Sequence, residues 1–211
     1  MTFKNIAIKN LITAQNIIDT CNSVIDKYHA NGELEPTNFS LDASSELIEL
    51  ISKKCLIDTI QWHLEDEVRS PDLSPKEGWS IKKKIDIYNQ RRTDTVELID
   101  QKLIVHYSDI KPLENATINS ETPGWIIDRL SILCLKLYHM KEQTQRKDVD
   151  KNQIVECLSK HYTLEEQQID LSQAFDQLMS DLSTGKKYMK LYFQMKMYND
   201  KHLNPALYKK N

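Results

Sequence analysis

An arginine occupies a position where the helical pattern of the sequence calls for an apolar side chain. Between residues 81 and 103 apolar residues recur at steps of three and four, and position 92, an arginine, falls within that stripe. A helix with this pattern turns Arg92 toward the core, where an unpaired charge is strongly unfavourable. We therefore expect a carboxylate to meet the guanidinium group of Arg92.

Two other segments carry charged residues that helices would place near such an arginine. Steps of three residues put His63, Asp66 and Arg69 along one helix edge. Eleven residues separate Asp128 from His139, so a helix places both on the same face. The two groups are Trp62, His63, Glu65, Asp66 and Arg69 in the first segment, and Asp128, Arg129, Lys136 and His139 in the second.

The sequence leaves two interpretations of this polar cluster open. In the first, the cluster is a buried salt-bridge network that fixes how three helices pack. In the second, it lines a pocket that binds an anion or performs acid and base chemistry, because charged groups in a low dielectric acquire shifted pKa values. The anion-binding candidates are Arg69, Arg92 and Arg129, and the catalytic candidates are His63, Asp66 and His139.

No metal or cofactor site is predicted. The ferritin-like carboxylate pattern needs Glu-x-x-His twice, and the sequence contains neither copy. The other histidines have no neighbours that suggest more than a surface or capping role; they are His29, His106, His161 and His202.

The loop 119–124 precedes an apolar segment and offers backbone amides that could hold an anion. Glu121 already supplies a negative charge beside these amides. We therefore favour a capping role for this loop over a ligand site.

Composition predicts a single all-α domain over residues 1–211, a bundle of six or seven helices. The chain has 28 Lys and Arg against 31 Asp and Glu, is 40% hydrophobic, and contains four glycines and six prolines. So few glycines and prolines argue against all-β folds and Gly-rich phosphate loops. The near-neutral charge of −3 argues against a nucleic-acid scaffold. The apolar content argues against a disordered chain.

Glycine and proline divide the chain into helical segments. Ser74 with Glu77, and Thr163 with Glu166, match the capping box that opens a helix. The segment after Pro123 is apolar almost all round, which predicts a central helix. We expect helices over about 3–31, 42–70, 74–107, 123–140, 150–161, 164–184 and 186–199.

The sequence predicts a cytoplasmic protein with no membrane span. The first residues lack the apolar core and cleavage site of a signal peptide, and charges interrupt every apolar stretch. The four cysteines are far apart and show no CxxC spacing, so we expect reduced core thiols; they are Cys21, Cys55, Cys134 and Cys157.

A basic helix and tail are expected over residues 186–211. From Gly185 onward the chain carries seven lysines and one acid, a net charge of +6. An apolar stripe at helical spacing predicts that this helix docks on the body of the protein and leaves its lysines in water; the stripe is Tyr188, Tyr192, Met195 and Tyr198. One basic helix on an acidic protein does not indicate nucleic-acid binding.

Four runs of the chain form a distinctive combination of motifs. They are Trp62-His63-x-Glu65-Asp66-x-x-Arg69, Asn89-Gln90-x-Arg92-x-Asp94, Asn119-Ser120-Glu121-Thr122-Pro123-Gly124 and Ile127-Asp128-Arg129-Leu130-Ser131. Together these runs resemble a bacterial family catalogued as domain of unknown function 4254, and they coincide with the polar cluster. The resemblance implies no activity, although members lie near glycosyltransferases of cell-envelope polysaccharide assembly.

Two functions follow as hypotheses. The first is a non-enzymatic accessory or interaction protein with an unidentified protein partner, because no recognised nucleophile, metal or phosphate motif is present. The alternative is an enzyme or binder for an anionic small molecule such as a phosphorylated sugar, acting through the His/Asp/Arg cluster.

Overall fold

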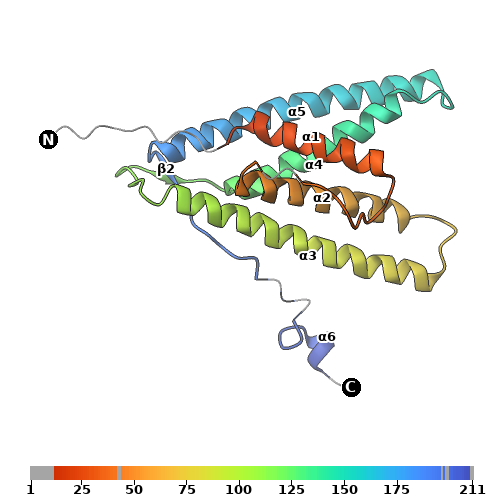
Figure 1. Cartoon of the computed structure of the whole chain (residues 1–211), viewed down its shortest axis with the longest axis horizontal. Coiled ribbons are helices and arrows are strands. Elements are labelled where there is room, and N and C mark those ends of the chain that lie inside the picture. The colour runs from red at the N-terminus through yellow and green to blue at the C-terminus, as the bar shows by residue number, and fades with distance from the viewer. Residues whose placement is uncertain (1–11, 42–43, 196, 198–199, 210–211) are drawn as a thin grey trace.

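The computed structural model describes residues 12–41, 44–195, 197 and 200–209, and most of these residues are helical (Figure 1). This confirms the predicted all-α bundle. The helices are α1 (Ala14–Asn31), α2 (Glu46–Glu67), α3 (Pro75–His106), α4 (Pro123–Thr144), α5 (Lys151–Ser183) and the short α6 (Pro205–Tyr208). Two short strands, β1 (Thr117–Ile118) and β2 (Lys187–Tyr188), pair in parallel.

The helices begin where the local capping chemistry is favourable. Ser74 and Glu77 form the predicted capping box of α3, and Thr122 caps α4 with Pro123 in its first turn. Helix α1 ends at Gly32, whose φ of 73° is a left-handed conformation that suits glycine. The expected start of this helix near residue 3 lies outside the described residues, while Thr13 caps a helix that begins at Ala14.

Helix α4 is central, as its apolar sequence predicted. It packs against each of the other four long helices, while α2 with α3 and α4 with α5 form two antiparallel hairpins (Figure 1). The main core contains residues from all five long helices, among them Ile17, Ile51, Ile99, Leu130 and Phe175. This packing brings polar residues of α1, α2, α3 and α4 close together.

The prediction of two helices over 150–161 and 164–184 is wrong, because α5 runs unbroken from Lys151 to Ser183. Thr163 donates its hydroxyl hydrogen to the carbonyl of Ser159 one turn earlier, instead of capping a new helix. Packing along α4 stabilises the continuous helix, which overrides the local capping pattern.

The predicted helix over 186–199 is also wrong. Gly185 takes a left-handed φ of 72°, and the carbonyls of Gly185 and Lys186 accept hydrogen bonds from Leu113 and Thr117. The chain therefore leaves α5 as a strand. Of the predicted stripe, Tyr188 is half-buried in β2, whereas Tyr192 and Met195 are 68% and 85% exposed. Tyr198 lies outside the described residues.

The cysteines are free thiols, in agreement with the prediction. Cys21, Cys55 and Cys134 are buried in the main core, whereas Cys157 is half-buried on α5. Across the part of the chain that the structure describes, we find no helix with the length and hydropathy to cross a membrane.

Candidate functional site

Arg92 of α3 meets a carboxylate, as its place in the apolar stripe predicted. Its Nε lies 2.7 Å from Oδ1 of Asp128 on α4, and its Nη2 lies 2.5 Å from Oδ2, so the contact is bidentate. Both hydrogen bonds are charge-assisted. They join α3 to α4, and the Arg92 side chain is only partly buried, with 27% of it exposed.

Two fully buried residues of α2, Lys54 and Asp58, complete this ion network. The Lys54 ammonium contacts Asp58 and lies 2.9 Å from Oδ1 of Asp128, while Ser131 donates to Asp58 at 2.6 Å. Burial lowers the pKa of Lys54, but the two carboxylates outweigh it and leave that pKa raised. Burial raises the pKa of Asp58, and Lys54 and Arg92 only partly offset it.

The pKa of Asp128 shifts in the opposite direction. Burial acts to raise it, but the hydrogen bonds and charges of Arg92 and Lys54 lower it below its usual value. Two cations and two carboxylates therefore balance one another among Lys54, Asp58, Arg92 and Asp128. The balance supports the first interpretation of the polar cluster, a network that fixes the packing of three helices.

The sequence analysis placed Asp128 near Arg92, but it missed Lys54 and Asp58 and offered Glu65 and Asp66 of α2 as further partners. Glu65 instead pairs with Arg69 at 2.6 Å, where the Arg69 side chain is 69% exposed, and Asp66 is also exposed. The sequence does contain a signal for Lys54 and Asp58: they are oppositely charged, four residues apart, and separated by apolar residues.

The loop before α4 is a cap, as we favoured, but the carboxylate comes from α3. Asp100 accepts hydrogen bonds from the Gly124 amide at 2.7 Å and from the Thr122 hydroxyl. Burial raises the pKa of Asp100 despite these donors. Glu121 instead pairs with Arg129 at 2.8 Å on the surface.

His63 and His139 come together, and His29 of α1 joins them. The Nε2 atoms of His29 and His63 are 3.1 Å apart, and one ring nitrogen of each of the three lies within 4.8 Å of those of the other two. Such a group could hold a transition metal. No sequence pattern marked His29, because it reaches the other two only through helix packing.

An aromatic ring stacks on each of these histidines. Tyr138 lies on His29 with ring centroids 4.2 Å apart, and Tyr28 lies on His63 at 5.3 Å. Trp62 lies on His139 at 5.0 Å with the rings nearly parallel. The stacking restricts how far each imidazole can rotate.

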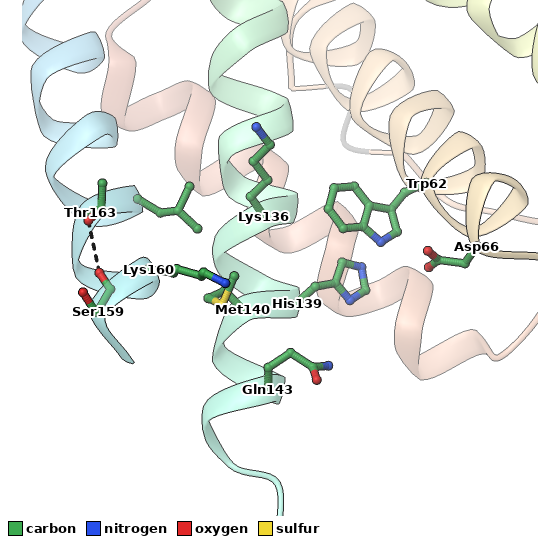
Figure 2. Close-up of a pocket in the computed structure, with 10 residues that line it drawn as sticks. Trp62, Asp66, Lys136, His139, Met140, Gln143, Ser159, Lys160 and Thr163 are labelled. Atoms are coloured by element: carbon green, nitrogen blue, oxygen red, sulfur yellow. Dashed lines mark hydrogen bonds between the residues drawn. The ribbon is translucent and has the colours of Figure 1, made fainter. Parts of the chain in front are cut away.

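An open groove runs along the seam between α4 and α5, beside this cluster. It consists of two hollows of about 640 Å³ and 630 Å³, and Lys136 of α4 lines both. Trp62 and Asp66 of α2 line one side of the first hollow, while Ser159, Lys160 and Thr163 of α5 line the other (Figure 2). The His139 ring extends from α4 toward Trp62 in Figure 2.

The lining of the groove contains one more cation than carboxylates. Four cationic side chains line the two hollows, against three carboxylates. The cations are Arg92, Arg129, Lys136 and Lys160, and the carboxylates are Asp66, Asp128 and Asp170. A volume of this size suits a small molecule rather than a macromolecule.

Some residues of the predicted cluster lie outside the groove. Neither Arg69 nor Glu65 lines either hollow, and the same is true of Asn89 and Asp94 on α3. The Asp94 carboxylate accepts a hydrogen bond from Gln90 on the surface. The structure thus separates the predicted cluster into a buried ion network, a histidine cluster and a surface group.

Comparison with known proteins gives one match. The family model described as "Protein of unknown function (DUF4254)" matches residues 48–191, more than half of the chain. The matched range includes His63, His139 and the buried ion network, whereas His29 precedes it. No curated protein and no solved structure matches the chain.

Proposed function

The chain belongs to the DUF4254 family, a family of unknown function, and we propose that it binds an anionic small molecule in the groove between α4 and α5. The proposal rests on the charge and shape of the groove, because the family description names no activity.

Lys136 is the observation that carries the proposal. Its exposed side chain lies where the two hollows meet, and no carboxylate among the described residues forms an ion pair with it. The other cations of the groove have partners: Lys160 pairs with Glu156, Arg129 with Glu121, and Arg92 with Asp128. Lys136 is therefore the cation most available to a ligand anion.

The rest of the first hollow suits a ligand that carries polar groups besides its anion. Gln143, Ser159 and Thr163 supply amide and hydroxyl groups, while Trp62, Met140 and Leu164 supply apolar surface. A phosphorylated sugar combines an anion for Lys136 with hydroxyl groups for these side chains. We take this class as the ligand.

A thermal-shift screen tests the proposal. The probes are inorganic phosphate, hexose phosphates and nucleoside diphosphates, and the uncharged hexoses and nucleosides are the controls. A ligand at 100 times its Kd stabilises the folded state by about 2.7 kcal/mol, a shift that melting curves resolve. Flat melting curves across the whole panel would remove the proposal.

Two finer expectations from the sequence stay predictions. One is location in the bacterial cytoplasm, and the other is an accessory role beside glycosyltransferases of cell-envelope assembly.

The second candidate function, an interaction protein, is favoured by exposed apolar side chains on the outer face of α5. Val155, Tyr162 and Ile169 lie seven residues apart there and are 64%, 65% and 58% exposed. Co-purification of a stoichiometric partner, lost on Tyr162→Lys, would support that role.

A further inference from the structure

His29, His63 and His139 form a nearly equilateral triangle. Each belongs to a different helix, and the three distances between ring centroids are 5.1, 5.1 and 5.2 Å. We propose that these three side chains bind one divalent transition-metal ion of the zinc class. The proposal goes beyond the anion groove, with which it shares only His139.

The hydrogen bonds around His29 and His139 leave a lone pair on one ring nitrogen of each. Nδ1 of His29 lies 2.7 Å from the carbonyl oxygen of Ile25, and Nδ1 of His139 lies 2.8 Å from Oε2 of Glu142. Both oxygens can only accept, so each Nδ1 carries the hydrogen and each Nε2 carries a lone pair. This is the tautomer that a metal bound at Nε2 requires.

No hydrogen bond among the described residues fixes the hydrogen of His63 on Nδ1. The Nδ1 atom of His63 lies 3.9 Å from Oδ2 of Asp66, and its Nε2 faces that of His29. Metal binding at Nε2 would place the hydrogen of His63 on Nδ1, on the side of Asp66.

Without a metal the cluster leaves a buried nitrogen unsatisfied. A hydrogen on Nε2 of His63 could satisfy His29, but Nε2 of His139 is buried and has no hydrogen-bond partner among the described residues. Buried polar atoms are nearly always paired. One ion between the three rings would satisfy all three Nε2 atoms at once.

The separations fit a first-row transition metal. Zinc–nitrogen bonds are about 2.0–2.1 Å long, so two nitrogens on a tetrahedral ion lie about 3.4 Å apart. The observed separations, from 3.1 Å up to the 4.8 Å limit, reach that value with small rotations of the rings. Three imidazoles and no oxygen ligand favour zinc, cobalt, nickel or copper over calcium and magnesium.

His63 and His139 lie on the partly exposed side of the cluster. The side chains of His63 and His139 are 26% and 15% exposed, and Asp66, beside them, lines the groove. Three protein ligands with one open position characterise catalytic rather than structural zinc sites. A ligand in the groove would therefore approach the ion from the side of His139.

The test is a titration of the chelator-treated full-length protein with Co²⁺ and with Zn²⁺ in a buffer without phosphate. The visible absorption of four-coordinate Co²⁺ reports the nitrogen ligands, and elemental analysis after gel filtration reports the stoichiometry. We expect one ion per chain, with binding lost in each of the variants His29→Gln, His63→Gln and His139→Gln. Two histidines outside the cluster give matched controls, His161→Gln and His202→Gln, which should bind as the wild type does.

A second variant keeps the test decisive if a ligand substitution disturbs folding. The Glu142 side chain is 50% exposed, so Glu142→Ala should fold normally, yet it removes the acceptor of His139 Nδ1. Loss of such an outer partner weakens metal binding by about 10–100-fold. Three results would each overturn the proposal. The wild type could fail to bind one metal ion per chain, any of the three ligand variants could still bind the ion, or Glu142→Ala could bind it with unchanged affinity. Anion binding is measured on metal-free protein, so either proposal can fail without the other.

Discussion

Replacing Lys54 with methionine should destabilise the protein strongly, although the two side chains are of similar length. Lys54 is fully buried and contacts the carboxylates of Asp58 and Asp128. Its loss leaves two buried carboxylates facing one guanidinium. Breaking a buried ion pair by removing one partner costs about 3–5 kcal/mol, and methionine should leave little cavity to add to that.

The assay is chemical denaturation together with thermal melting. For a chain of this length about 4 kcal/mol corresponds to a fall of roughly 10 °C in Tm. The neighbouring Lys53 is exposed, so Lys53→Met provides a control that removes the same charge and should change stability by less than about 0.5 kcal/mol. The double variant Lys54→Met with Asp58→Leu removes the unpaired charge and should recover much of the loss.

The pH dependence of this variant gives a second check. Burial already raises the pKa of Asp58, and loss of Lys54 should raise it further. A carboxyl whose folded pKa lies above its unfolded value stabilises the fold at low pH, and this contribution is lost as the pH rises through the folded pKa. The deficit of Lys54→Met should therefore be smaller at about pH 5 than at about pH 8. Equal stability of Lys54→Met and Lys53→Met, or a deficit independent of pH, would refute the buried network.

Three further predictions concern other contacts of the bundle. Gly124→Ala should destabilise the protein by about 1–3 kcal/mol in denaturation, because the new Cβ would lie 2.7 Å from the Asp100 carboxyl group. Gly78→Ala places its Cβ in open space on α3 and should stabilise by about 0.5–1 kcal/mol. The same sign for both variants would contradict this packing. The raised pKa of Asp100 predicts that Asp100→Asn gains stability relative to the wild type as the pH rises from about 4 to about 7, and a pH-independent difference would count against it. The effects of Arg92→Leu and Asp66→Leu should add, since Arg92 pairs with other carboxylates, and a coupling energy above about 0.5 kcal/mol in a double-mutant cycle would show a shared network.

Local sequence signals predicted the helix starts well and the tertiary contacts less well. The capping box of Ser74 and Glu77 involves only neighbouring residues, so its prediction held in the structure. The same pattern at Thr163 and Glu166 lies inside α5, because packing on α4 keeps the backbone helical there. A capping motif is therefore informative only where packing allows the chain to turn.

The candidate site shows the same division. The apolar stripe of α3 predicted that Arg92 needs an acid, because burial follows from helical periodicity. Which acid it meets depends on the arrangement of α2 and α4, which no local pattern contains. The meeting of His29 with His63, 34 residues apart, likewise arises only when α1 and α2 pack. Periodicity thus showed that Arg92 needs an acid, but it did not identify Lys54 and Asp58, the fully buried members of the network.

Calorimetric titration of the metal-free protein with the best anion from the screen tests the central claim most directly. Wild-type protein and Lys53→Met should bind it with the same Kd. Lys136→Met should bind it about 10-fold or more weakly, because a hydrogen bond to a charged group contributes about 1.5–3 kcal/mol. Equal affinity of Lys136→Met and Lys53→Met would contradict an anion site in the groove between α4 and α5.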